Sequence, residues 1–141
     1  MYSIKKIFKF ETAHILSNSY SEECQNFHGH SYKLEVIVQS EKLNSSGVVI
    51  DFKLLKEIIT PIIKKLDHKC LVNSKVKATE HMQKMLESRG MIFVQYNPTA
   101  ENMIKYLYDE INKFLYNYKV KLNLWETETG CVSYCDEKEK F

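Results

Sequence analysis

The chain has 141 residues, of which 44% are hydrophobic and 27% charged. This composition predicts a packed core and excludes a disordered chain. Twenty basic and eighteen acidic residues give a formal net charge of only +2, so there is no general electrostatic case for nucleic acid or an anionic membrane as a partner. The length suits one domain, and we expect residues 1–141 to form it.

Neither a signal peptide nor a membrane span is expected. The first ten residues alternate charged with bulky side chains and lack the continuous apolar stretch of a signal peptide. Apolar runs elsewhere are far shorter than the roughly 20 residues that a membrane-spanning helix needs. We therefore expect a cytoplasmic protein with reduced cysteines. The four cysteines form no C-x-x-C pair, which argues against a zinc ribbon or a thioredoxin-like site.

Hydrophobic patterns along the chain predict an α+β fold. Strand patterns occupy residues 4–14, 30–39, 91–96, 120–126 and 131–134. Helical patterns occupy residues 52–66, 78–89 and 99–115. Hairpins that flank helices predict an antiparallel sheet with two main helices on one face. The open edges of such a sheet favour oligomerisation.

The tripeptide His28-Gly29-His30 carries the strongest chemical signal. Residues two apart in a strand point the same way, so both imidazoles can reach one ion. His14 shares the inward phase of its own strand, which we expect to pair with the strand at residues 30–39. Three imidazoles and an open fourth position are typical of catalytic zinc sites. The alternative is a set of hydrogen-bonded core histidines, and Cys24 is the one obvious fourth ligand for a closed structural site.

The positions of three further residues or pairs in the sequence make them candidates for a functional role. Cys24 lies on a polar loop near the histidines. A nearby metal and imidazoles would favour its thiolate, which could act as a base or a nucleophile. The alternative is that Cys24 is only a small hydrophobic residue. Asp67-His68 follows a helix directly, either as a proton relay or as a histidine stabilised by the helix dipole. Glu126 continues the inward phase of the last long strand, where a carboxylate needs donors from a ligand or from water.

Together these pieces resemble the family of 6-pyruvoyl-tetrahydropterin and 6-carboxytetrahydropterin synthases. The matching segments, in family order, are residues 10–14, 24–32, 47–52, 66–68, 97–102 and 126–127. The resemblance implies a tunnelling fold whose subunits close into a barrel as trimers, which pair into a homohexamer. The stretch between His68 and Asn97 is longer than is usual in the family.

The resemblance also implies a role for each matching residue. His14, His28 and His30 would be the ligands of a Zn²⁺ cofactor, and Cys24 would be the catalytic thiol. Asp67 and His68 would be its partner dyad. Two residues would meet the substrate: Glu126 would anchor the pterin ring, and Thr99 lies in the motif that forms the pterin pocket.

The resemblance further implies a zinc lyase that acts on 7,8-dihydroneopterin triphosphate. Three residues separate Cys24 from His28, a short spacing that resembles the branch that makes 6-carboxy-5,6,7,8-tetrahydropterin for queuosine biosynthesis. That branch releases acetaldehyde and triphosphate. The first alternative is a 6-pyruvoyl-tetrahydropterin synthase, which stops after eliminating triphosphate. The second is a non-catalytic, metal-stabilised oligomer that binds pterin.

Overall fold

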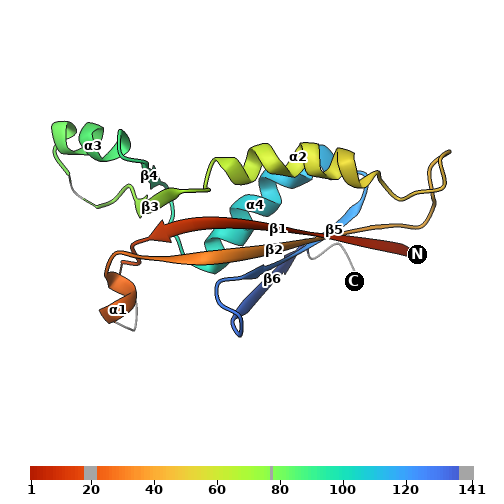
Figure 1. The fold of residues 1–141 in the computed structure, drawn as a ribbon, viewed down its shortest axis with the longest axis horizontal. Coiled ribbons are helices and arrows are strands. Elements are labelled where there is room, and N and C mark those ends of the chain that lie inside the picture. Colours follow the sequence, from red (N-terminus) through yellow and green to blue (C-terminus); the bar gives the residue numbers. More distant parts are fainter. Residues whose placement is uncertain (18–21, 77, 137–141) are drawn as a thin grey trace.

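The computed structural model describes residues 1–17, 22–76 and 78–136. Their strands form one six-stranded sheet in the order β4-β3-β1-β2-β5-β6 (Figure 1). The strands are β1 (Tyr2–His14), β2 (His28–Ser40), β3 (Lys69–Asn73), β4 (Met91–Val94), β5 (Lys119–Trp125) and β6 (Cys131–Cys135). The helices are α1 (Glu22–Gln25), α2 (Phe52–Lys64), α3 (Glu80–Glu87) and α4 (Ala100–Leu115). The expected α+β class is confirmed.

The sheet is mixed rather than antiparallel throughout. β1, β2, β5 and β6 pair antiparallel, whereas β3 runs parallel to β1 and β4 runs parallel to β3. The sequence pattern missed β3, because Cys70, Leu71 and Val72 are all buried and so do not alternate with polar residues. Parallel neighbours also need crossover connections, and helices α2 and α3 lie in those connections.

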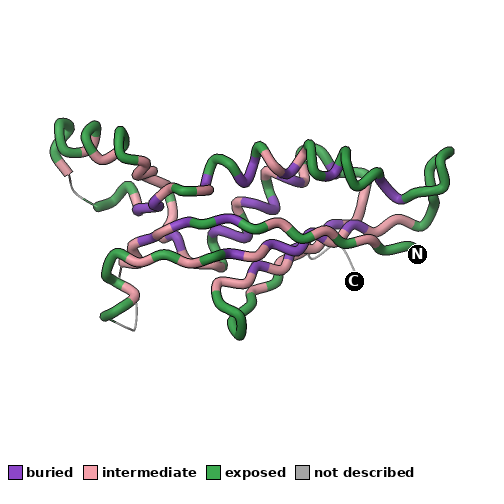
Figure 2. Tube along the Cα trace, viewed as in Figure 1, coloured by how far each residue is buried: buried purple, intermediate pink, exposed green. Residues whose placement is uncertain are grey.

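Helices α2 and α4 cover one face of the sheet, as predicted (Figure 1). Buried segments of both helices lie against buried segments of the strands (Figure 2). The core contains Phe10, Tyr32, Leu34, Val36, Val38, Leu55, Ile59, Met103, Leu107, Ile111, Leu122 and Leu124. Helix α3 lies beyond this core, at one end of the molecule, and has no buried residue. None of the described helices combines the length and apolar character that crossing a bilayer requires.

Candidate active site

Pairing between β1 and β2 gathers the three predicted histidines on the core face of the sheet. His14 lies directly opposite His28, and Thr12 lies opposite His30. Side chains two residues apart share a face, so all three imidazoles project to the same side. One ring nitrogen from each lies within 4.8 Å of the others, and His14 is fully buried. Among the described residues this is the one cluster of potential metal ligands, and Cys24 is not part of it.

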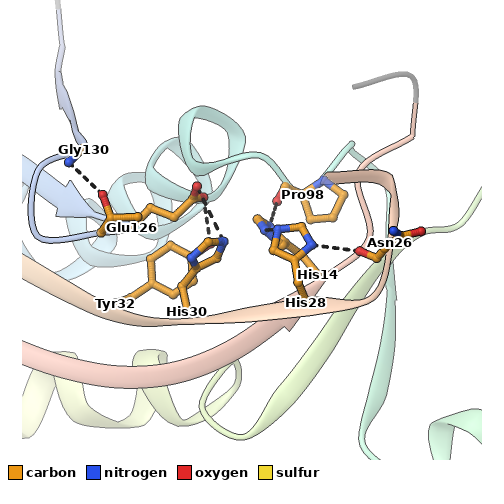
Figure 3. A network of polar contacts seen from close by, with 9 residues as sticks. His14, Asn26, His28, His30, Tyr32, Pro98, Glu126 and Gly130 are labelled. Carbon is orange, nitrogen blue, oxygen red and sulfur yellow. Dashed lines mark hydrogen bonds and ion pairs between the residues drawn. The ribbon is translucent and has the colours of Figure 1, made fainter. Parts of the chain in front are cut away.

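Backbone carbonyls fix the orientation of two of these rings (Figure 3). Nδ1 of His14 lies 2.8 Å from the carbonyl oxygen of Pro98, and Nδ1 of His28 lies 2.8 Å from that of Asn26. A carbonyl oxygen only accepts hydrogen bonds, so each Nδ1 carries a proton and donates it. The Nε2 atom of each neutral ring is then left with a lone pair. Backbone hydrogen bonds of this kind orient metal-binding histidines in proteins.

The geometry of the Nε2 atoms fits a bound cation. The Nε2 atoms of His14 and His28 are only 2.8 Å apart. With both protons on Nδ1, two lone pairs face each other, and this repulsion is relieved by a cation between them. Nε2 of His30 is buried and has no hydrogen-bond partner among the described residues. A divalent metal would satisfy all three nitrogens at once, so the residues present fit the predicted metal site.

The electrostatic environment keeps two of the rings neutral. Burial lowers the pKa of His14, against an opposing effect of its hydrogen bond to Pro98. Burial also lowers the pKa of His30, although the negative charge of Glu126 works in the other direction. A neutral imidazole is the form that binds a metal. The two shifts therefore favour the ligating state near neutral pH.

Glu126 lies at the opening of the histidine cluster, immediately after β5. Its Oε1 lies 3.6 Å from Nε2 of His30, which is too long for a hydrogen bond. Its Oε2 accepts a hydrogen bond of 3.1 Å from the hydroxyl of Tyr32, whose pKa is raised by burial and by the charge of Glu126. The side chain is 31% exposed. The carboxylate thus lies beside the potential ligands and keeps acceptor capacity free for another molecule (Figure 3).

The start of α4 closes the other side of the cluster. Thr99 is the N-cap of this helix, and its hydroxyl accepts a hydrogen bond of 3.3 Å from the backbone N–H of Asn102. The side chain of Asn97 accepts from the backbone N–H of Ser17 and donates to the Ser17 carbonyl. These contacts hold the Pro98 carbonyl toward His14.

The Asp67–His68 dyad forms, and neither residue is part of the histidine cluster. Oδ1 of Asp67 lies 3.0 Å from Nδ1 of His68 and accepts a hydrogen bond from the backbone N–H of Glu11. That hydrogen bond is the main reason why the pKa of Asp67 is lowered. His68 has a positive φ of 58°, its N–H donates to the Glu11 carbonyl, and its side chain is 79% exposed. A positive φ is uncommon outside glycine, and here it places an exposed imidazole beside the carboxylate of Asp67.

Cys24 lies on α1, the short helix that precedes β2. Its carbonyl accepts a hydrogen bond of 3.3 Å from the backbone N–H of Leu16, which joins α1 to the end of β1. The side chain is partly buried. The preceding residues 18–21, part of the loop expected before the histidines, lie outside the described residues.

Some contacts at the site could not be read from side-chain types. The carbonyl oxygens of Asn26 and Pro98 set the histidine rings, although any residue carries a carbonyl. The sequence pattern predicts that Tyr32 is a core residue, because it shares the phase of the apolar residues of β2. Only the fold shows that its hydroxyl lies next to Glu126. The motif that includes Asn97 and Pro98 was the available signal for this part of the site.

The family model described as 6-pyruvoyl tetrahydropterin synthase matches residues 3–137. A 6-carboxy-5,6,7,8-tetrahydropterin synthase of Aquifex aeolicus is 31% identical, with 96% of this chain and 99% of the relative covered. One of Haemophilus influenzae is 29% identical over 99% of this chain and 100% of the relative. Among solved structures, the 6-pyruvoyl tetrahydropterin synthase of Caenorhabditis elegans has a TM-score of 0.69 at 22% identity, with 96% of each chain covered. An uncharacterised protein of Wolinella succinogenes has a TM-score of 0.78 at 19% identity, covering 96% of this chain and 98% of its own.

Proposed function

Because the chain belongs to the 6-pyruvoyl tetrahydropterin synthase family, we propose that it is a zinc-dependent lyase of queuosine biosynthesis in the cytoplasm. Its substrate is 7,8-dihydroneopterin triphosphate, and its products are 6-carboxy-5,6,7,8-tetrahydropterin, acetaldehyde and triphosphate. Two relatives that match nearly the whole chain carry the name of this carboxy-forming enzyme. The short spacing between Cys24 and His28 supports the same branch.

The observation that carries the proposal is the position of Glu126 beside three imidazoles. The imidazoles would hold the zinc ion, which supplies Lewis-acid chemistry to oxygen atoms of the substrate side chain. Glu126 accepts two hydrogen bonds from the amino group and ring N–H of the pterin. Tyr32 stays protonated and donates to the same carboxylate, so it keeps the acceptor in place. The pterin ring is thereby oriented with its side chain toward the histidines.

Proton transfer is assigned to Cys24 and the dyad. Sγ of Cys24, as a thiolate, takes and returns protons at the side-chain carbons of the substrate. His68 is held by Asp67 through Nδ1, so its Nε2 is the atom that accepts or returns a proton. Thr99 lies one residue from the Pro98 carbonyl that holds His14, which supports a place for Thr99 at the rim of the pterin pocket.

The dyad acts on the site of another copy of the chain. Asp67 and His68 hydrogen-bond to the backbone of Glu11 at the edge of β1, and neither is part of the histidine cluster. The ring of His68 is largely exposed, so it is open to the site of a neighbouring subunit. We therefore propose that the functional unit is a homo-oligomer, a hexamer of two trimers, with each site shared between subunits.

Product analysis tests the reaction. Zinc-loaded protein is incubated with 7,8-dihydroneopterin triphosphate, and the pterin product is identified by mass while acetaldehyde is trapped as a hydrazone. The proposal expects 6-carboxytetrahydropterin and acetaldehyde in equal amounts. Formation of 6-pyruvoyl-tetrahydropterin without acetaldehyde would assign the chain to the pyruvoyl-forming branch of the family.

A second comparison separates catalysis from binding. Cys24→Ala should bind the pterin and zinc but lose turnover, because only the proton-transferring thiol is removed. Cys131→Ala is the matched control, since Cys131 is exposed on β6. Unchanged turnover in Cys24→Ala would remove the thiol from the mechanism, and tight pterin binding with no turnover in the wild type would leave a non-catalytic pterin-binding protein.

A further inference from the structure

A pocket of about 580 Å³ lies against the ends of β1 and β2 that carry the three histidines, and His30 is part of its lining. From these strands it is lined mainly by residues of the outward phase, including Glu11 and Ser31. The opposite wall comes from the start of β3 and the turn between α3 and β4. That wall supplies three basic side chains, His68, Lys69 and Arg89. The proposed lyase mechanism uses His30 and His68 and leaves Lys69 and Arg89 without a role.

Arg89 is the only arginine in a chain that has nineteen lysines. It lies beside His68 because of the parallel pairing of β3 and β4. Cys70 is the register partner of Met91, and two residues back along each segment bring His68 level with Arg89. The N–H of Cys70 donates to the carbonyl of Gly90 at 3.0 Å, and Gly90 makes the turn with a φ of 85°. The turn therefore holds the arginine next to the dyad.

The guanidinium of Arg89 is available for a ligand. No carboxylate within the described ranges forms an ion pair or hydrogen bond with it. The two acidic side chains nearby are already engaged. Glu11 accepts a hydrogen bond of 2.6 Å from the hydroxyl of Ser31, and Asp67 accepts from the Glu11 backbone and contacts His68.

The remaining pocket residues do not compete for an anion. Burial raises the pKa of the Cys70 thiol to about 11, so this thiol is neutral near pH 7. Lys69 adds a second cation on the same wall as Arg89. Glu11 carries a negative charge on the opposite wall, which directs an anion toward Arg89 and Lys69 and away from the strands.

We propose that Arg89, with Lys69, binds the triphosphate group of the substrate. This proposal rests on the proposed function. Elimination removes a proton from a side-chain carbon and breaks the adjacent bond between carbon and oxygen, whose electron pair leaves with triphosphate. A guanidinium binds phosphate oxygens in a bidentate manner, and beside His68 it offsets the charge of the leaving group where proton transfer occurs.

Binding of inorganic tripolyphosphate tests the site without metal or turnover. The assembled wild-type protein, Arg89→Gln and Lys84→Gln are titrated by calorimetry. Lys84 is the matched control, because it is an exposed basic residue of α3 that pairs with Glu80 outside the pocket. Since hydrogen bonds to charged groups are strong, Arg89→Gln should weaken tripolyphosphate binding about tenfold or more. Arg89→Lys should retain part of the affinity, and Lys84→Gln should bind as the wild type does.

Substrate binding gives the second readout. Arg89→Gln should weaken 7,8-dihydroneopterin triphosphate and leave the affinity for unphosphorylated 7,8-dihydroneopterin unchanged. Equal tripolyphosphate affinity in Arg89→Gln and the wild type would overturn the site, as would equal weakening of both pterins. If tripolyphosphate binds through Arg89 but no pterin is turned over, the anion site stands and the lyase proposal fails.

Discussion

The rings of His14 and His28 depend on two backbone carbonyl oxygens, those of Pro98 and Asn26. These acceptors place both protons on Nδ1 and leave two Nε2 lone pairs 2.8 Å apart. A cation placed between these two nitrogens would relieve the repulsion between the lone pairs, so the geometry fits a metal site.

Removal of any one ligand should release the metal. A site with three protein ligands has no spare donor, so His28→Ala and His30→Ala should each fall from about one zinc per chain to near none by elemental analysis. His81→Ala is the matched control, because His81 is an exposed histidine of α3. Stoichiometric zinc in His30→Ala would show that the coordination assigned to this cluster is wrong.

Glu126 is expected to act on the pterin and not on the metal. Glu126→Gln keeps the size of the side chain and removes the charge that accepts two N–H bonds from the pterin. The loss of charge-assisted hydrogen bonds should weaken pterin binding by about 1.5–3 kcal/mol. Zinc content should be unchanged.

Glu128→Gln provides the comparison, since Glu128 is exposed in the turn between β5 and β6. Pterin affinity and zinc content are measured on the same preparations by calorimetry and elemental analysis. Wild-type pterin affinity in Glu126→Gln would exclude the anchor role.

At the level of elements, the alternation of apolar and polar residues in the strands was the main basis for predicting the fold and the histidine cluster. The inward phase of residues 4–14 and 30–39 placed His14, His28 and His30 on one face, and the observed register of β1 and β2 brings them together. β3 was missed because its apolar residues are buried without alternation. The pairing of β3 with β1 and β4 depends on contacts between distant segments, which no local pattern encodes.

Thr99 has an observed capping role and a proposed role in pterin binding, and one pair of substitutions can separate the two. Thr99→Ala removes the N-cap hydroxyl, which should lower the free energy of unfolding by about 1 kcal/mol. Thr99→Asn keeps a capping side chain and replaces the hydroxyl, so it should unfold at nearly the wild-type denaturant concentration while pterin binding weakens. Thr79→Ala, at the N-cap of α3, is the control for cap loss far from the histidines. Normal pterin affinity in Thr99→Asn would leave Thr99 with the capping role alone.

At the scale of the whole molecule, the part of the chain that the structure describes has β4 and β6 as the edges of its sheet and leaves one face of the sheet without a covering helix. Exposed edges pair readily with another chain, and strands joined edge to edge around an axis close into a barrel. These edges support the proposed oligomer, and so do the positions of the described site residues. The histidines lie on the helix-covered side of the sheet, while the ring of His68 is exposed at the edge of β1.

Mixing two inactive variants tests the shared site directly. Cys24→Ala lacks the proposed thiol and His68→Ala lacks its partner, so each homo-oligomer should be inactive. If the two residues of one site come from different subunits, oligomers formed by co-expression contain sites with both residues intact. Random assembly at equal amounts should restore about a quarter of wild-type activity, because each intact residue is present with even odds. Mixing Cys24→Ala with the double variant Cys24→Ala/His68→Ala should restore none. Failure of the first mixture to recover activity, in oligomers shown by mass to contain both variants, would place Cys24 and His68 in the same subunit's site.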